Sequence, residues 1–391
     1  MDDLYDAKEF FKLSYDASRL NTSFIDCLEL QIDDIYGRKL VTNRDLKTGD
    51  VITVERPFFK SLDKNATDSR CLNCFKPLPV AEVHCRTCNS AKFCSEICRS
   101  TSWDEFHQFE CQEFDKFTQD DGFMLMIQRT IFKSLKVYGG WENLQKALDG
   151  NLSGCTIFDF SMNENVKDND RKRFISCWSL EAAPQTKDEE KIALSLVNNH
   201  SVIKTMCKTK DQKKSLQEFI TKLIGIFNHN LFTLHWNHQE SSAEETACGL
   251  FAFASFMNHS CAPNVFRVCF EDKVAFIACR PINAGNQLLM SYQCRFYQAP
   301  TIDRQMLLSK QFDFKCLCEA CQNNFPLLND LERLDPQFTE PVDHFESVAE
   351  AVTCWKMNCD YIDANRGMYP SYEIVRVMQN NHKIIRYLIK K

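Results

Sequence analysis

The chain lacks a long apolar run, an excess of basic residues and a leader-like amino terminus. No hydrophobic stretch approaches the roughly 20 residues of a membrane-spanning helix, so we expect no membrane partner. The formal net charge of −6 argues against direct nucleic-acid binding, which needs a basic face. The first residues, Met1 to Tyr5, form neither a basic nor an apolar segment, and we therefore expect an intracellular protein.

Cysteine is abundant instead, at 21 of 391 residues. A secreted chain would use that many thiols for disulfides, but an intracellular chain keeps them reduced, so clustered cysteines indicate metal ligands. The rest of the composition, with 44% hydrophobic and 26% charged residues, is that of a soluble globular protein long enough for two or three domains.

Residues 71–111 carry closely spaced pairs of metal-ligand side chains. The pairs are Cys71-x2-Cys74, Cys85-x2-Cys88, Cys94-x3-Cys98 and His107-x3-Cys111. Each pair can hold one side of a tetrahedral ion, so together they predict two closed zinc sites. So short a segment with few large apolar side chains would hardly fold without metal. His84 competes with His107 as a ligand, but its position next to Cys85 is awkward for a tetrahedral site, and we favour His107.

A second cluster closes the apolar run 249–257 with Asn258-His259-Ser260-Cys261. Polar side chains at the end of a buried segment cost free energy unless they are satisfied, so a ligand, a metal or a neighbouring segment must lie here. Further along, Cys316-x-Cys318-x2-Cys321 offers three thiols to a zinc site that needs four ligands. Cys261 is the obvious donor of the fourth.

Periodicity gives a coarse outline of the elements. Strands are predicted at 35–42, 51–56, 265–270, 273–279 and 287–292. Helical spacing dominates 112–235, and a short helix is expected within 1–25. Residues 60–70 are expected to form a polar linker. Asn230 stands in an apolar context, where a helix cap or a turn explains a lone asparagine as well as a functional role does.

The tail from residue 326 shows the spacing of two helices that are separated by Pro370. A pair of helices this short cannot bury its apolar stripes alone. It either docks on the body of the protein or begins a helical repeat array.

The motifs follow one another in a fixed order: a strand pair, the cysteine-rich module, Asn258-His259-Ser260-Cys261-x-Pro-Asn, Ser291-Tyr292 and the thiols at 316–321. This order resembles that of the SET-and-MYND family of protein lysine methyltransferases. The resemblance covers about residues 30–325. It implies an α+β fold, a SET-domain β-fold with an inserted MYND zinc finger, a post-SET zinc knot and a helical carboxyl-terminal segment. The implied segments are 1–25 amino-terminal, 26–70 first SET part, 71–111 finger, 112–235 helical insert, 236–295 SET core, 296–325 post-SET knot and 326–391 helical tail.

The same resemblance implies the cofactors and the residues that hold them. S-adenosyl-L-methionine and three zinc ions are expected. One ion would be held by Cys71, Cys74, Cys94 and Cys98, another by Cys85, Cys88, His107 and Cys111, and the third by Cys261, Cys316, Cys318 and Cys321. Cofactor contacts would come from Gly37, Arg38, Lys39, Asn230, Asn258, His259, Tyr292 and Phe314. Tyr292 would be the catalytic residue. A sulfonium methyl is already activated, so the enzyme mainly aligns it with a neutral lysine amine, and no metal or carboxylate base is required.

Two positions depart from the family pattern. The family's Gly-x-Gly turn reads Gly37-Arg38-Lys39, where a lysine side chain could crowd the cofactor. Phe312 stands where the family commonly has a tyrosine that helps to build the lysine channel. Two functions therefore remain open. One is lysine methylation of histone or non-histone proteins in transcriptional regulation, and the other is a weakly active or inactive scaffold that binds corepressors such as histone deacetylase complexes.

Further expectations concern partners and location. The finger would bind proline-rich peptides or corepressor proteins, because an extended polyproline peptide suits a shallow groove. The substrate would be a protein or peptide lysine. We expect a monomer that is present in both cytoplasm and nucleus.

Overall fold

The computed structural model describes residues 10–18, 23–35, 37–115, 122–150, 154–161, 165–235 and 246–389. The chain forms two compact units. The first, here called the split unit, consists of residues 1–55, 256–270 and 274–391. The second, the inserted unit, consists of residues 56–255 and 271–273. Among the described helices, none has the length and apolar character needed to cross a membrane.

The split unit combines short strands with helices near the end of the chain. Its strands are β1 Leu28–Asp33, β2 Gly37–Thr42, β3 Val51–Glu55, β9 Asn258–His259, β10 Val265–Phe270, β11 Lys273–Ala278 and β12 Leu289–Met290. Its helices are α11 Thr301–Phe312, α12 Glu319–Gln322, α13 Val348–Ala364 and α14 Tyr372–Ile389, with 3-10 turns at Leu328–Asp330 and Arg366–Met368.

Three small sheets organise the split unit. β1 and β2 form an antiparallel hairpin, and β10, β11 and β3 form a three-stranded sheet in that order. β9 and β12 are a parallel pair, in which Leu289 lies opposite Asn258 and Met290 opposite His259. This pairing matters for function, because it brings the segment before Tyr292 alongside the Asn258–Cys261 cluster.

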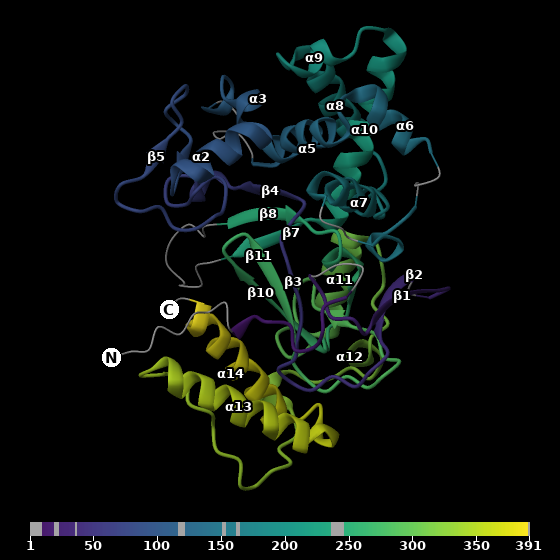
Figure 1. Cartoon of the computed structure of the whole chain (residues 1–391). Coiled ribbons are helices and arrows are strands. Elements are labelled where there is room, and N and C mark those ends of the chain that lie inside the picture. Colours follow the sequence, from purple (N-terminus) through teal and green to yellow (C-terminus); the bar gives the residue numbers. More distant parts are fainter. Residues whose placement is uncertain are drawn as a thin grey trace. The chain divides into compact units, whose positions relative to one another are not determined.

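The tail helices dock on the three-stranded sheet. α13 and α14 run side by side (Figure 1), and their buried side chains join those of β10 and β11 in one hydrophobic core. Trp355 of α13 and Ile385 of α14 belong to this core together with Phe266 and Ile277 of the sheet. Of the two arrangements predicted for the tail, docking is therefore the one that the structure has.

The inserted unit contains the cysteine-rich module and most of the helices. Its strands are β4 Phe59–Leu62, β5 Val83–His84, β6 Lys92–Phe93, β7 Phe232–His235 and β8 Thr246–Leu250. Its helices are α2 Glu96–Ser102, α3 Gln108–Glu110, α5 Gly122–Tyr138, α6 Trp141–Leu148, α7 Val166–Trp178, α8 Lys187–Asn199, α9 Ile203–Met206 and α10 Lys210–Asn230. A π-helical turn spans Trp103–His107, and 3-10 turns span Lys64–Ala66, Ile157–Asp159 and, at the boundary with the split unit, Ala254–Phe256.

Local sequence explains where the long helix α10 begins and which face it buries. Thr209 accepts a hydrogen bond from the Gln212 backbone, and the Gln212 side chain accepts one from the Thr209 backbone, which is a capping box. The apolar residues at helical spacing, among them Leu216, Ile220 and Phe227, are buried, as their periodicity predicts.

Several predicted elements have different bounds in the structure. Residues 60–70 are not simply a linker, because Phe59–Leu62 is a strand paired with β8. The strand expected at 35–42 begins only at Gly37, and its partner β1 was not anticipated. The strand expected at 287–292 is reduced to Leu289–Met290. Of the helix expected within 1–25, residues 1–9 and 19–22 lie outside the described residues, and 11–18 are irregular, with Ala17 in a β-bridge to Ile25.

Candidate functional site

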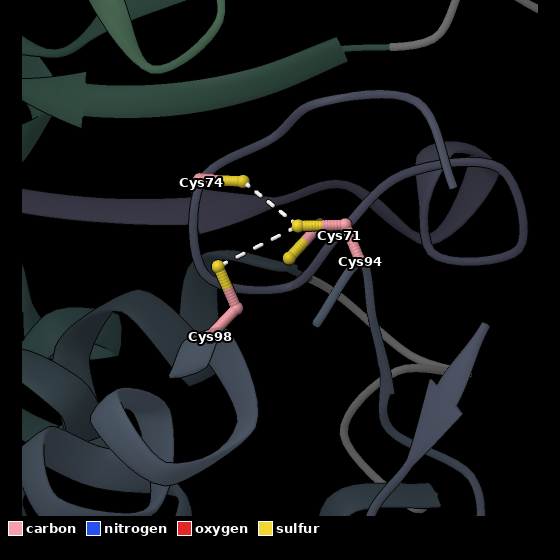
Figure 2. A group of neighbouring side chains, drawn as sticks. All are labelled: Cys71, Cys74, Cys94 and Cys98. Atoms are coloured by element: carbon pink, nitrogen blue, oxygen red, sulfur yellow. Dashed lines mark hydrogen bonds between the residues drawn. The ribbon is translucent and has the colours of Figure 1, made fainter. Parts of the chain in front are cut away.

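The first metal centre lies in the inserted unit, where two cysteines before β5 meet two that flank the start of α2. The Cys94 sulfur is 3.6 Å from that of Cys74 and 3.6 Å from that of Cys98. Figure 2 shows the four sulfurs directed toward one another. Tetrahedral zinc with Zn–S bonds of about 2.3 Å separates its sulfurs by roughly 3.8 Å, so these distances suit zinc. Ser95 caps α2 by accepting a hydrogen bond from the Cys98 backbone, which fixes that ligand.

The second centre is formed by Cys85, Cys88, His107 and Cys111. The sulfurs of Cys85 and Cys111 are 3.8 Å apart, and the His107 Nε2 atom is 3.5 Å from the Cys88 sulfur. His84 stays outside this cluster, since its ring nitrogens face the Asn89 carbonyl and the Glu82 carboxylate. The structure therefore groups His107, and not His84, with these three cysteines.

A buried ion pair supports the second centre. The His107 Nδ1 atom lies 3.2 Å from Glu110, whose carboxylate accepts two hydrogen bonds from the Arg129 guanidinium at 2.7 and 2.8 Å. Burial opposes ionisation of Glu110, but Arg129 and His107 outweigh it and lower the pKa of this carboxyl. A carboxylate on the second ring nitrogen fixes the orientation of a ligating histidine.

The third centre lies in the split unit. Its ligands are Cys261, Cys316, Cys318 and Cys321. The sulfurs of Cys261 and Cys321 are 3.6 Å apart, and the wholly buried Arg304 of α11 donates a hydrogen bond to the Cys321 sulfur at 3.7 Å. Four thiolates on one zinc ion leave a net negative charge, which a buried guanidinium offsets.

All three groupings are those that the family resemblance implies. Within each, the ligand atoms lie within 4.8 Å of one another. Four sulfurs, or three sulfurs and one imidazole nitrogen, are the donor sets of structural zinc. Zinc would hold the finger segment and the 316–321 loop in place, and its ligands leave no open coordination position for catalysis.

Tyr292 is held between the β9–β12 pair and the aromatic end of α11. Its hydroxyl donates a hydrogen bond to the Met257 carbonyl at 2.7 Å, and its backbone N–H donates to Nδ1 of His259 at 2.9 Å. Burial raises the pKa of the Tyr292 hydroxyl well above its ordinary value and lowers the pKa of His259 to about 4. Both side chains are therefore neutral near neutral pH.

The turn at Gly37 contacts the same cluster through Asn258. The Asn258 amide nitrogen donates to the Arg38 carbonyl at 2.9 Å, and the Arg38 guanidinium lies 4.9 Å from the centre of the Phe256 ring. Gly37 has φ +63°, a conformation that favours glycine, and among the described residues no atom beyond its chain neighbours lies within 4 Å of where a Cβ would stand. An open, glycine-bearing turn next to the half-buried Asn258 amide is a surface that a ligand can approach closely.

Lys39 directs its side chain along the hairpin. It lies in the extended strand β2 opposite Gln31, and its ammonium nitrogen is 2.6 Å from the Asp33 carboxylate. The backbone at this position thus does not require glycine.

Aromatic side chains line the other side of Tyr292. Phe312 ends α11, Asp313 turns the chain with φ +55°, and Phe314 follows. The Tyr292 ring lies 5.0 Å from that of Phe312 and 6.5 Å from that of Phe314, and the Phe314 ring lies 6.0 Å from that of His259. The structure therefore brings Tyr292, His259 and Phe314 together as predicted, with Phe312 among them.

Of the predicted cofactor contacts, Asn230 is the one that belongs to the inserted unit. It is the last residue of α10, and its amide nitrogen donates to the carbonyls of Ile226 at 2.8 Å and Glu181 at 2.7 Å. These are the bonds of a residue that closes a helix end. Its contact with a cofactor stays a prediction.

Some residues of the site were not anticipated from sequence. Buried Asn264 donates to the Gln287 carbonyl at 2.8 Å and accepts from the Leu289 backbone at 2.7 Å, which anchors β12 below Tyr292. The Asn-His-Ser-Cys-x-Pro-Asn spacing contained this residue without indicating its role. Nothing in the local sequence pointed to Glu110, Arg129 or Arg304, because their partners are distant in sequence or depend on how the helices fold.

Comparison with known proteins places this site in a class. Residues 37–293, well over half of the chain, match the SET domain family model. The chain therefore belongs to the SET domain family. Within it, the three ligand clusters and the similar proteins identify a divergent member of the SET-and-MYND group.

The similar proteins are distant. A SET and MYND domain-containing protein of Dictyostelium discoideum is 21% identical over 91% of this chain and 93% of its own length. The Arabidopsis thaliana histone-lysine N-methyltransferase ASHR1 is 24% identical over 76% of this chain and 55% of its own. The mouse histone-lysine N-methyltransferase Smyd1 is 23% identical over 87% and 64%. The chain thus spans little more than half of the plant protein.

Proposed function

We propose that the protein is an S-adenosyl-L-methionine-dependent protein lysine N-methyltransferase that acts on histone or non-histone proteins. The observation that carries this proposal is the convergence of the Gly37 turn, Asn258 and Tyr292 within one SET domain. The names of the plant and mouse relatives, both histone-lysine N-methyltransferases, support it.

The residues around Tyr292 fit a polar cofactor. The Gly37 turn leaves open space at its Cα, and the adjoining Asn258 amide is fixed by the Arg38 carbonyl. The Ser291 hydroxyl is buried and has no hydrogen-bond partner among the described residues. A buried hydroxyl of this kind calls for a ligand or water to satisfy it. Gly37, Arg38, Asn258 and Phe314 would hold S-adenosylmethionine, which supplies an activated methyl group when bound.

The geometry of Tyr292 defines what its hydroxyl does. The hydroxyl hydrogen is donated to the Met257 carbonyl, so the phenolic oxygen is oriented to accept a hydrogen bond from a substrate amine. The raised pKa keeps the hydroxyl from ionising, so Tyr292 orients the amine and does not act as a base. Its oxygen can also make weak C–H···O contacts with a methyl group that carries partial positive charge.

The lysine must lose its proton before it attacks. A lysine amine is protonated at neutral pH, but an apolar channel lowers its pKa by desolvation. Phe312 and Phe314, packed around Tyr292, provide such surroundings. Phe312, Phe314 and Tyr292 would hold the neutral amine for the activated methyl group that bound S-adenosylmethionine would supply, and the proton of the lysine would go to solvent.

Calorimetric titration with S-adenosylmethionine is the primary test. We expect saturable binding, and no binding at millimolar cofactor would contradict the proposal. Methyl transfer from labelled cofactor to histones and to a cytosolic protein extract then identifies a substrate class.

Tyr292→Phe tests the assigned role. Loss of one oriented hydroxyl in a water-poor site is expected to reduce kcat by at least about a hundredfold and to leave the cofactor Kd nearly unchanged. The matched control is Tyr372→Phe, which removes a hydroxyl that hydrogen-bonds the Glu340 carboxylate and not the Met257 carbonyl. Unchanged turnover in Tyr292→Phe would refute the role. Cofactor binding without turnover on any substrate would favour the scaffold function, in which the finger recruits corepressors.

A further inference from the structure

Both ring nitrogens of His259 have a hydrogen-bond partner. Nδ1 lies 2.9 Å from the backbone nitrogen of Tyr292, and Nε2 lies 3.3 Å from the Cys261 sulfur. The ring is buried, with 8% of the residue exposed. It therefore sits between a ligand of the third metal centre and the backbone of the residue to which we assign catalysis.

The direction of these hydrogen bonds follows from their partners. A peptide N–H can only donate, so Nδ1 accepts and carries no hydrogen. The hydrogen of the neutral ring is then on Nε2, which points at Cys261. A zinc-bound cysteine is a thiolate, and a thiolate accepts hydrogen bonds. The chain Tyr292 N–H to His259 and His259 N–H to Cys261 is therefore continuous and consistent in polarity.

We propose that His259 is a positioning residue that links the third zinc centre to Tyr292, and that its side chain does not contact the cofactor. The family resemblance implies a cofactor contact at His259 without assigning it to the side chain. The positioning role of His259 rests on the proposed function only for the importance of Tyr292. The third metal centre has no open coordination position, but it then fixes the position of Tyr292 through the His259 imidazole.

The surroundings of the third centre support this role. Two of its four sulfurs receive N–H donors from outside the ligand set, Cys261 from His259 and Cys321 from Arg304. Such donors offset thiolate charge and orient the ligands, and their loss typically weakens metal binding by 10–100-fold. Of the two donors, His259 is the one that also bonds the Tyr292 backbone. Its loss is expected to affect both zinc retention and the position of Tyr292.

Two substitutions test the two hydrogen bonds of the His259 side chain separately. In His259→Asn the side-chain oxygen can take the place of Nδ1 and accept from Tyr292, but the reach to Cys261 is lost. In His259→Gln the amide nitrogen can reach Cys261, but no acceptor remains for Tyr292. His344→Asn is the matched control, because His344 is exposed on the same unit.

Zinc release to a colorimetric chelator and cofactor titration are measured on the full zinc-loaded chain. For His259→Asn we expect one of the three zinc equivalents to leave at least tenfold faster, with a cofactor Kd within threefold of the original. For His259→Gln we expect near-normal zinc release and a fall of at least tenfold in kcat. His344→Asn should alter none of these.

The outcomes decide the inference without ambiguity. Unchanged zinc release in His259→Asn, or a cofactor Kd raised tenfold or more, overturns it. Should either variant fail to fold, the imidazole ¹⁵N spectrum of the unsubstituted chain gives the tautomer directly, and a hydrogen on Nδ1 also overturns it. If the unsubstituted chain does not bind S-adenosylmethionine, the proposed function fails, whereas zinc release and the tautomer still test the link.

Discussion

The backbone and the side chain of Lys39 have different roles. The backbone continues β2, and the ammonium group pairs with Asp33 on the neighbouring strand. A side chain anchored along its own hairpin does not have to enter the space next to the Gly37 turn. The lysine at the second glycine position is thus compatible with an intact site.

Lys39→Gly tests this compatibility. We expect a cofactor Kd within about threefold of the original, because the lysine side chain is not in the site. Stability should fall by only about 1 kcal/mol, since a glycine weakens a strand by this amount and a partly exposed ion pair adds little. Titration calorimetry and urea unfolding provide the measurements, with Lys39→Met as a control that keeps the side-chain length. Cofactor binding tightened tenfold by Lys39→Gly would show that the lysine obstructs the site.

At the residue scale, the sequence predicted metal ligands where they occur in closely spaced pairs. A spacing of two or three residues between thiols is already half of a metal site, so the ligands of all three centres could be proposed from spacing and resemblance. The residues that support those ligands could not. Arg129 and Arg304 are ordinary charged residues in helical sequence, and only the folded chain brings them to Glu110 and Cys321.

Among the elements, the turn before β3 holds the tail helices through close packing. Gly49 has φ +93°, and a Cβ there would stand 2.9 Å from the Cys359 sulfur of α13. The Thr48 backbone also donates to the Asp363 carboxylate at 3.1 Å. The turn and α13 thus fit together at a position that tolerates only glycine.

Gly49→Ala is expected to destabilise the protein by more than Gly285→Ala. Gly285 also has a positive φ, +82°, but its Cβ position is open. The control therefore carries only the backbone strain, about 1–2 kcal/mol. Gly49→Ala should add roughly 1–3 kcal/mol from overpacking against Cys359. Equal losses in urea unfolding would show that the turn and α13 do not pack as closely as the structure indicates.

The Arg129–Glu110 ion pair connects helix α5 to residues 71–111. Because both side chains are buried, the loss of one of them is expected to lower the stability of the protein strongly. Arg129→Met leaves the Glu110 carboxylate buried without its main partner, which should cost about 3–5 kcal/mol. The double variant Glu110→Gln/Arg129→Met removes the unpaired charge and is expected to be more stable than Arg129→Met alone. Urea unfolding of both variants measures the difference. A double variant no more stable than the single one would mean that the charge itself is not the cause.

Elements were predictable where periodicity extends over many residues, as in α10 and in the tail helices. Short strands were not. β4 has only four residues, and its polar residues Lys60 and Ser61 made it resemble a linker. In the structure Lys60 pairs with Asp272, and Ser61 is fully buried. The reduced strand β12 is set by the parallel pairing with β9, which no local pattern reveals.

At the scale of the whole molecule, the metal centres divide between the two units. The two finger centres lie in the inserted unit, and the third lies in the split unit. The helical parts have large apolar cores of their own, whereas residues 71–111 depend on their ligands. Metal removal should therefore unfold particular segments and leave others intact.

Hydrogen exchange after chelation tests this division. With zinc removed, peptides from 71–111 and from 313–325 should exchange nearly as fast as an unfolded chain, because their order comes from the ligands. Peptides from α10 and α14 should stay protected, since their buried side chains do not depend on metal. Peptides that contain Tyr292 should lose protection together with 313–325, because His259 connects the two. Protection that persists at 71–111 would show that the finger folds without metal, and loss of protection throughout would show that zinc supports the whole fold.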